Sequence, residues 1–443
     1  MKNLRISEIS PKRLTPYPRN ARTHSKKHIR QIAESIKQFG WTNPILVDGE
    51  GGVIAGHGRL MAALELGLEN VPVVAITSLS EAEKRAYIIA DNKLAENAGW
   101  DPAVLAIELQ SLLEVDIDLD ITLTGFEMAE IDILIGEAAD GGETEEEPPS
   151  VDRNRPAISK PGDKWEIGRH RIMCGDATNA NDAARLLGDE KAQMIFTDPP
   201  YNVPVDGHVC GLGKVRHREF AMASGEMTRE QFEKFLKTAF LNLARSSVDG
   251  AIHFIFMDWR HIAEVMAAAG EVYDEFKNLC IWAKTNGGMG SLYRSMHELV
   301  FVFKSGTGAH INNVELGRHG RNRTNVWTYP GINSFGGDRN TELNLHPTVK
   351  PIALVSDAIQ DCSNRGGIIL DVFSGSGTTL LAAEKTGRRG YGLELDPVYV
   401  DVMLRRLQAA TGQDAILHED GRTFAEIERE SLASDVDKSG VSQ

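Results

Sequence analysis

The residues best placed to do chemistry lie in the stretch Thr197-Asp198-Pro199-Pro200-Tyr201-Asn202. The preceding Met194-Ile195-Phe196 is apolar, as expected of a short buried strand. The two prolines cannot continue a strand ladder, so they fix a stiff turn where the strand ends. In open α/β sheets, ligands bind at that end of the strands. The turn is therefore a candidate binding site.

This turn offers three groups suited to holding a planar base that carries an exocyclic amino group. The Asp198 carboxylate only accepts hydrogen bonds, the Pro199 carbonyl has no strand partner, and the Tyr201 ring is flat. Two acceptors can take the two amino hydrogens while the ring stacks on the base. A proline-rich turn without function would have the same local sequence, so the rest of the chain decides between the two interpretations.

A second stretch, Gly367 to Thr379, predicts a buried strand that runs into glycines at the start of a helix. Gly375 and Gly377 allow a ligand to approach the backbone closely. The next strand ends in Glu394, about twenty residues beyond the glycines, where a carboxylate can accept both ribose hydroxyls of a nucleoside cofactor. The pattern indicates an adenosine-containing cofactor, although taken alone it would also fit NAD.

Composition and charge narrow the class of protein. The chain has 443 residues, of which 42% are hydrophobic and 25% charged, as in soluble proteins of two to four domains. Its four cysteines are widely spaced without a C-x-x-C pair, so we expect no metal site and no disulfide framework, in a reduced, cytoplasmic protein. We see no membrane span or signal peptide. The net charge of −15 argues against indiscriminate DNA coating but allows a local basic stretch.

The order of the predicted elements gives the domain organisation. Strands alternate with helices after residue 160, which predicts a doubly wound, mostly parallel sheet. An acidic run with glycine and proline, Asp140 to Ser150, predicts a linker. We expect an α/β domain at 1–95, a helical extension at 96–138, a linker at 139–160, a catalytic half at 161–306, a target-recognition insert at 307–345, a cofactor half at 346–433 and a disordered tail at 434–443.

Together the two stretches resemble the amino-methyltransferases of DNA, which share a D/N/S-P-P-Y turn and an F-x-G-x-G loop. The target-side motif precedes the cofactor motif here, which is the order of the β class. The run His346 to Pro351 resembles the H-P-T-x-K-P element of that class, and Trp282 to Gly290 and His297-Glu298 match its later segments. The resemblance covers essentially residues 160 to 425. It implies a Rossmann-like sheet, S-adenosylmethionine as methyl donor and double-stranded DNA as substrate.

The resemblance also implies roles for individual residues. Asp198 and the Pro199 carbonyl would bind the amino group, Pro200 would complete the turn and Tyr201 would stack on the base. Thr348 and Lys350 would lie near the methionine end of the cofactor and Asp176 near its adenine; a capping or surface role explains Lys350 and Asp176 equally well. The full expected cofactor set is Asp176, Thr348, Lys350, Asp371, Phe373, Gly375, Gly377, Thr378 and Glu394.

The target base must leave the duplex stack before its amino nitrogen can react. The D-P-P-Y form favours adenine N6 by family habit, and cytosine N4 is the alternative. The insert holds arginine and asparagine, which read base edges; a solvated loop that only touches phosphates is the other interpretation. The candidate recognition residues are Arg318, Arg321, Arg323 and Asn325.

Residues 1–95 resemble the ParB/sulfiredoxin-like domain, through Ala21 to His24, Trp41 to Val47 and Ala55 to Ala63. In partition proteins a G-x-x-R box holds a nucleoside triphosphate, with Mg²⁺. The later E-N-x-x-R box of that family is absent, so a plain DNA-positioning role is an equal alternative. The matching box here is Gly56, His57, Gly58 and Arg59.

Such a fusion is associated with phage and prophage methyltransferases and with restriction–modification, and we expect a homodimer. A rival from another class is a nucleotide-switched ParB-like DNA-binding protein with an inactive methyltransferase body. The intact D-P-P-Y and F-x-G-x-G motifs argue against that rival.

Overall fold

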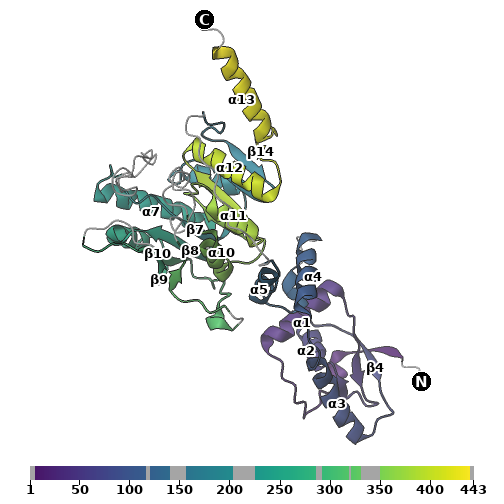
Figure 1. Cartoon of the computed structure of the whole chain (residues 1–443). Helices are drawn as coiled ribbons and strands as arrows, with labels where there is room; N and C mark the ends of the chain where they lie inside the picture. The colour runs from purple at the N-terminus through teal and green to yellow at the C-terminus, as the bar shows by residue number, and fades with distance from the viewer. Residues whose placement is uncertain are drawn as a thin grey trace. The chain divides into compact units, whose positions relative to one another are not determined.

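The computed structural model describes residues 5–115, 120–139, 156–202, 225–285, 292–318, 321–330 and 350–439. The chain divides into two compact units, residues 1–142 and 143–443 (Figure 1). Thr348 and the rest of the H-P-T-x segment lie outside the described residues.

The first unit contains a four-stranded sheet in the order β1-β4-β2-β3. Strands β2 and β4 pair in parallel, and the two other pairs are antiparallel. Apolar side chains from the strands and from the helix that follows β3 form a buried core. In the strands the side chains of this core alternate, because successive side chains point to opposite faces of a sheet. The strands are β1 (Ile6–Ile9), β2 (Ile45–Val47), β3 (Val53–Ala55) and β4 (Val71–Ala75).

Three helices accompany this sheet, and two of them begin at serine caps. The Ser25 side chain accepts from the His28 N–H, and Ser80 forms a reciprocal capping box with Glu83. The helices are α1 (Lys26–Phe39), α2 (His57–Glu65) and α3 (Glu81–Glu96), with a short 3₁₀ turn η1 (Pro11–Arg13) after β1.

A pair of helices with its own small core ends the first unit. Helix α4 (Pro102–Val115) packs against α5 (Met128–Ala139), and the 3₁₀ turn η2 (Ile121–Thr124) lies between them in sequence. Leu109, Ile121 and Ile131 are the buried residues of this core.

The second unit is built on a ten-stranded sheet in the order β11-β9-β10-β8-β7-β12-β13-β6-β5-β14. The central strands, from β8 through β7, β12 and β13 to β6, all pair in parallel. The strands are β5 (Lys164–Ile167), β6 (His170–Cys174), β7 (Ala192–Thr197), β8 (Ser247–Met257), β9 (Glu275–Ala283), β10 (His297–Ser305), β11 (Val326–Thr328), β12 (Ile368–Asp371), β13 (Arg389–Glu394) and β14 (Ile416–Leu417).

Antiparallel strands flank the parallel centre. Strand β10 runs antiparallel to both β8 and β9, and β5 runs antiparallel to β6 and β14, while β11 joins β9 in parallel. The start of β10 therefore lies at the same edge of the sheet as the end of β8. The predicted doubly wound, mostly parallel sheet is confirmed.

Helices cover both faces of this sheet (Figure 1). Side chains from α6, α7 and α8 share one core with the sheet, and those of α10, α11 and α12 share two further cores with it. No helix in the described part of the chain is long and apolar enough to cross a membrane. The helices are α6 (Ala180–Leu187), α7 (Arg229–Ser246), α8 (Ile262–Gly270), α10 (Ile352–Cys362), α11 (Thr378–Lys385), α12 (Pro397–Thr411) and α13 (Phe424–Ser439), with 3₁₀ turns η3 (Trp259–His261) and η4 (Glu315–Gly317).

Candidate active site

The two chemically informative stretches meet because their strands are neighbours in the sheet. Strands β7 and β12 pair in parallel, with Met194 opposite Ile369. The D-P-P-Y turn follows β7 and the glycine loop follows β12, so both lie at the carboxyl edge of the sheet. Strand β13 pairs with β12 on the other side and brings Glu394 to the same edge. Segments almost two hundred residues apart thus form one site.

A buried carboxylate ties the two strand ends together. Asp371 accepts from the Thr197 hydroxyl at 2.8 Å, from the Thr379 hydroxyl at 2.6 Å and from the Phe373 N–H at 3.1 Å. It is only 4% exposed, and burial raises its pKa to about 6. Its oxygens are already occupied, so its geometry favours positioning the glycine loop over direct contact with a ligand.

The glycine loop has the backbone of a ligand-binding turn. Gly375 and Gly377 have φ of 50° and 85°, in the left-handed region that favours glycine. A Cβ on Gly377 would lie 2.4 Å from Met403, whereas one on Gly375 would meet nothing within 4 Å. Gly377 caps α11, whose first residue is the buried Thr378. Open space beside Gly375 is what a ligand lying against the loop requires.

Glu394 closes the loop from the other side. Its carboxylate accepts from the Gly375 N–H at 2.8 Å and from the Asp396 N–H at 2.9 Å. Burial raises its pKa to about 7, against the opposing effect of those two hydrogen bonds. Phe373 packs against Phe235, with 5.8 Å between ring centroids. The carboxylate and the aromatic ring thus flank the glycines, as a bound nucleoside would need.

Asp176 lies just after β6, beside the end of β13, where Cys174 pairs with Glu394. Its Oδ1 accepts from the N–H and the hydroxyl of Thr178, both at 2.8 Å. This local turn gives Asp176 a structural role; a contact to the cofactor adenine remains a prediction.

Four charged side chains and a phenol form a compact cluster at the D-P-P-Y turn. The Lys350 ammonium contacts Asp198 Oδ2 and lies 3.1 Å from Glu298 Oε2. The Tyr201 hydroxyl donates to Asp198 Oδ1 at 2.7 Å and lies 3.2 Å from Glu298 Oε2. Lys284 reaches Glu298 Oε1 at 2.5 Å. The family resemblance implied that Lys350 lies near the methionine end of the cofactor. In the structure, the Lys350 ammonium contacts Asp198.

The ionisation of this cluster follows from burial and from the alternating charges. Burial would raise the pKa of Glu298, but Lys350 and Lys284 lower it to about 2. Burial raises the pKa of Asp198 and the Glu298 charge adds to this, while Lys350 opposes it. Burial would lower the pKa of Lys350, which the two carboxylates instead raise. Burial also raises the pKa of Tyr201 well above its usual value. Tyr201 therefore stays a hydrogen-bond donor at neutral pH.

Asn202 fixes the end of the D-P-P-Y turn. It has a φ of 51°, which asparagine tolerates better than most residues. Its side-chain amide donates to the Met227 carbonyl at 2.9 Å and accepts from the N–H groups of Gly225 and Met227. These bonds hold the turn against the residues that precede α7.

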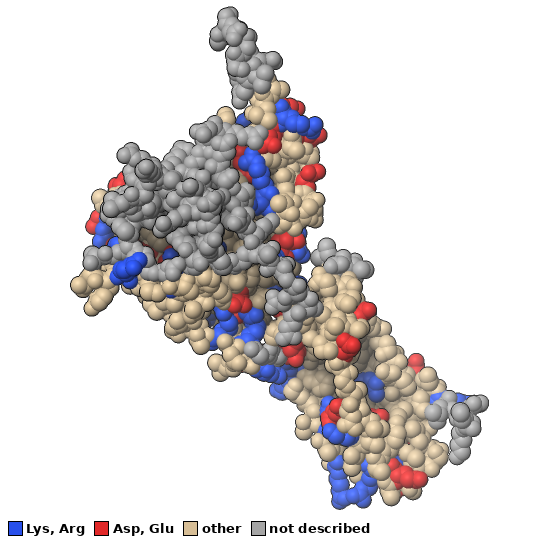
Figure 2. Space-filling view, in the orientation of Figure 1, with Lys and Arg blue, Asp and Glu red and all other residues tan. Residues whose placement is uncertain are grey.

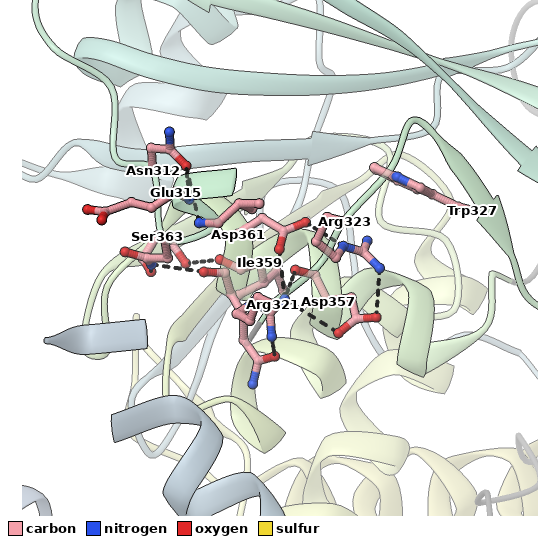
Figure 3. A network of polar contacts seen from close by, with 12 residues as sticks. Asn312, Glu315, Arg321, Arg323, Trp327, Asp357, Ile359, Asp361 and Ser363 are labelled. Carbon is pink, nitrogen blue, oxygen red and sulfur yellow. Dashed lines mark hydrogen bonds and ion pairs between the residues drawn. The ribbon is translucent and has the colours of Figure 1, made fainter. Parts of the chain in front are cut away.

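Two of the predicted DNA-reading arginines are paired with carboxylates of α10 (Figure 3). Arg321 donates to Asp361 at 2.7 Å and to the Gln360 side chain at 2.8 Å. Arg323 donates to Asp361 at 2.9 Å and to Asp357 at 3.0 Å, and lies 5.4 Å from the Trp327 ring centroid. The two arginine side chains are only 11% and 18% exposed. Reading DNA would require these ion pairs to open, so the geometry favours anchoring of the insert to α10.

The Arg323→Met variant tests this anchoring. Removing one partner of a largely buried ion pair leaves Asp361 and Asp357 with one cation fewer, so we expect the second unit to lose about 2–4 kcal/mol of unfolding free energy. Urea unfolding, followed by the transition of that unit, measures the loss. The matched control is Arg318→Met, since Arg318 is 62% exposed and pairs only with Glu315 at 3.0 Å among the described residues. We expect the control to change stability by at most about 0.5 kcal/mol. An unchanged Arg323→Met transition would contradict the anchoring role.

The two other candidate recognition residues are more accessible. Arg318 is exposed, and the exposed Asn325 side chain donates weakly to the Leu279 carbonyl at 3.4 Å. On the face drawn in Figure 2, the described Lys and Arg side chains occur in small groups beside Asp and Glu, without one continuous basic surface. Their contact with DNA stays a prediction.

In the first unit, the Gly-x-x-R box forms the start of α2. Gly56 caps this helix with a φ of 96°, and the Arg59 guanidinium lies against it, 3.0 Å from where a Cβ would be. Arg59 Nε is buried without a hydrogen-bond partner among the described residues. His57 is buried, with its Nε2 accepting from the Tyr17 N–H at 3.2 Å. Burial lowers the pKa of Arg59, and the nearby Asp91 carboxylate opposes this; that carboxylate would also compete with a bound phosphate.

Three family models match successive parts of the chain. The ParB N-terminal domain matches residues 1–93, the ParB-methyltransferase HTH domain 103–161, and the DNA methylase model for N6 and N4 enzymes 192–405.

The similar proteins are of two kinds, ParB-like proteins and DNA methyltransferases. The ParB-like nuclease domain-containing protein YnaK of Escherichia coli (strain K12) is 54% identical over 72 residues, which are 16% of this chain and 83% of YnaK. The type II methyltransferase M.HpaI of Haemophilus parainfluenzae is 26% identical over 261 residues, 56% of this chain and 77% of M.HpaI. The solved M1.HpyAVI–SAM complex is 21% identical, with a TM-score of 0.40 over 53% of this chain and 98% of the other. Residues 192–405 thus match an N6/N4 DNA methylase domain, and ParB-type domains precede it in the chain.

The sequence predicted residues 96–138 only as a helical extension, whereas residues 103–161 match the ParB-methyltransferase HTH domain. The available signal was two apolar-patterned helices, α4 and α5, separated by a short turn at η2. The charge of the region is unusual for a DNA-binding domain, because no Lys, Arg or His occurs between Lys93 and Arg153, while Asp and Glu recur throughout. Cationic side chains supply most of the affinity for DNA phosphates, so this region lacks that source of affinity.

Proposed function

We propose that this chain transfers a methyl group from S-adenosylmethionine to the exocyclic N6 of an adenine flipped out of double-stranded DNA. The match of residues 192–405 to the N6/N4 DNA methylase model supports the reaction class. The observation that carries the proposal is that the D-P-P-Y turn after β7, the glycine loop after β12 and Glu394 at the end of β13 lie at one edge of the sheet. An acceptor for an amino group and a nucleoside-binding loop share one edge of the sheet.

The turn would act on the base through hydrogen bonding and stacking. Asp198 and the Pro199 carbonyl would accept the two amino hydrogens, which draws the nitrogen lone pair out of the ring system. Tyr201 would hold the base plane, and Pro200 would keep the turn stiff. Holding the two reacting atoms in line then supplies most of the rate enhancement. The proton is lost after transfer, and Asp198, as an acceptor of an amino N–H, would take it.

The glycine loop fits the proposed cofactor. Glu394 would accept from the ribose hydroxyls, Phe373 would flank the nucleoside, and the open side of Gly375 would admit it. When bound, S-adenosylmethionine supplies an electrophilic methyl group. Thr378 and Asp371 would support the loop from beneath, and a contact of Thr348 or Asp176 with the cofactor stays a prediction.

The pKa of Glu394, about 7, predicts pH-dependent cofactor binding. The carboxylate accepts from both hydroxyls only when ionised, and protonation below pH 7 removes that form. We therefore expect the dissociation constant to be flat above about pH 8 and to rise roughly tenfold between pH 8 and pH 6. Calorimetric titration of the protein with S-adenosylmethionine across this range measures it. A flat profile from pH 8 to pH 5.5 would contradict the role of Glu394.

Nucleoside mass spectrometry tests the reaction itself. Unmethylated DNA is incubated with the protein and S-adenosylmethionine, then digested to nucleosides. N6-methyladenine is the expected product. N4-methylcytosine would preserve the chemistry and correct the base, because the same turn can hold cytosine. Absence of any methylated base, with cofactor binding shown separately, would favour the rival class, a DNA-binding protein with an inactive methyltransferase body.

A second candidate function is nucleotide binding by the first unit. The α2 N-terminus and the unpartnered Arg59 Nε favour an anion at Gly56, His57 and Gly58. Equilibrium binding of each nucleoside triphosphate with Mg²⁺, compared between wild type and Arg59→Gln, tests it. No measurable binding at millimolar nucleotide would leave DNA positioning as the role of this unit.

A further inference from the structure

Lys350 is almost fully buried and lies between two carboxylates. The residue is 6% exposed, and its ammonium contacts Asp198 Oδ2 and Glu298 Oε2. The rings of Phe256 and Trp282 lie 4.9 Å and 5.8 Å from the ammonium nitrogen. Carboxylates on one side and aromatic faces on the other hold the charge in place, since ring faces attract cations.

Glu298 connects this charge to Tyr201. Its Oε2 lies within reach of both the Tyr201 hydroxyl and Lys350, and its Oε1 binds Lys284. Glu298 is the second residue of β10, whose antiparallel course brings it to the edge where β7 ends. The two carboxylates and two ammoniums together carry no net charge, which limits the cost of burying them.

Both oxygens of Asp198 are occupied in the structure, one by Lys350 and one by the Tyr201 hydroxyl. An amino group must therefore take the place of one donor or share it. Tyr201 is the donor that can leave, because its hydroxyl has a second acceptor in Glu298. If Lys350 left, the two buried carboxylates would retain only Lys284, on Glu298, as a cationic partner among the residues of this cluster.

We propose that Lys350, Glu298 and Lys284 form a charge clamp that positions the D-P-P-Y turn for the incoming base. Lys350 holds Asp198 by Oδ2 and turns Oδ1 toward the base. The Tyr201 hydroxyl occupies Oδ1 until the amino N–H donates there, and Glu298 then retains the hydroxyl so that the ring stays in the stacking plane. These are positioning residues for the reaction proposed above, and the inference rests on that function.

A double-mutant cycle tests the link between Glu298 and Tyr201. Tyr201→Phe removes the hydroxyl and keeps the ring; Glu298→Gln keeps the shape and removes the charge. If Glu298 acts partly through the hydroxyl, Glu298→Gln lowers kcat by about tenfold to a hundredfold in the wild type and by clearly less in the Tyr201→Phe background. Both variants should bind S-adenosylmethionine within about twofold of wild type, since Glu394 is intact. Equal losses in both backgrounds would overturn the link.

Lys350→Met tests the orientation of Asp198. We expect kcat to fall on the order of a hundredfold with the KM for DNA changed much less, because the base still finds Tyr201. Lys284→Met removes an equal charge without touching Asp198 and should cost less. Lys304→Met, on the same strand as Glu298, replaces a lysine that contacts only Glu275 at 3.7 Å among the described residues and should leave kcat unchanged. A Lys350→Met loss no larger than that of Lys284→Met would overturn the orientation role.

The same cycle in thermal unfolding separates this inference from the proposed function. The contact between Tyr201 and Glu298 exists without DNA, so non-additive Tm changes are expected in the free protein. Non-additive Tm changes in a protein that methylates nothing would keep the clamp and reject the function. Additive Tm and kcat changes in an active enzyme would reject the clamp alone.

Discussion

The Asp198→Ala variant should lose base methylation by roughly a thousandfold or more, with S-adenosylmethionine binding within about twofold of wild type. Asp198 supplies the charged acceptor for the amino group, and nothing else in the described site replaces it. Glu394 and the glycine loop lie on neighbouring strands and do not contact it, so cofactor binding should persist. Single-turnover methylation with nucleoside mass spectrometry, together with calorimetry, measures both quantities.

A conservative variant at the same position should have a smaller effect. Asn is also found at this position of the motif family, so Asp198→Asn should retain part of the activity through its amide oxygen. Its loss should be smaller than that of Asp198→Ala. Lys350 keeps Glu298 as a partner in both variants, which limits the loss of stability. If Asp198→Ala lost cofactor binding while its fold was preserved, the division between target side and cofactor side would be wrong.

The Glu394→Ala variant should have the opposite profile. It removes a charged acceptor for two ribose hydroxyls, and hydrogen bonds to charged groups contribute about 1.5–3 kcal/mol each, so we expect the dissociation constant of S-adenosylmethionine to rise about a hundredfold. At saturating cofactor, methylation should recover, because the D-P-P-Y turn is untouched. Calorimetry and rate measurements at rising cofactor concentration test this.

Glu394→Gln is the matched control for the ionisation of this residue. The amide keeps one acceptor and cannot titrate, so affinity should be intermediate and independent of pH between pH 8 and pH 6. A Glu394→Gln protein that kept the pH dependence of the wild type would place the titrating group elsewhere.

The sequence predicted the fold and the two strand ends at which the candidate site lies because both signals are local. Prolines or glycines after a buried strand indicate where the strand ends and which groups lie at that end. Strands β7 and β12 pair in parallel, and the carboxyl ends of parallel strands lie at the same edge of a sheet. Thr348 lies outside the described residues, so its role stays a prediction.

The charge clamp was not predictable in the same way. Lys350 and Asp198 are far apart in the chain, and no local pattern says that an ammonium will reach a given carboxylate. The pair His297-Glu298 was noticed only as a family match, without a role. The position of Glu298 depends on the antiparallel register of β10 against β8 and β9, which the sequence alone does not fix.

The arginines of the insert have partners that their local sequence does not reveal. The sequence predicts Arg321 and Arg323 as DNA-reading residues because arginine reads base edges. Their partners, Asp357 and Asp361, lie one turn apart on one face of α10. Two carboxylates at that spacing on an otherwise apolar helix were the signal that could have indicated an anchoring site.

The Asp371 carboxylate accepts from the Thr197 hydroxyl and from the Phe373 N–H, so it connects the proposed base site to the proposed cofactor site. If bound cofactor changes the affinity for a flipped base by some factor, then a bound base must change the affinity for the cofactor by the same factor. The order in which the two ligands arrive therefore changes the path but not the total free energy. A measured preference for one order would therefore report the height of the barriers on each path.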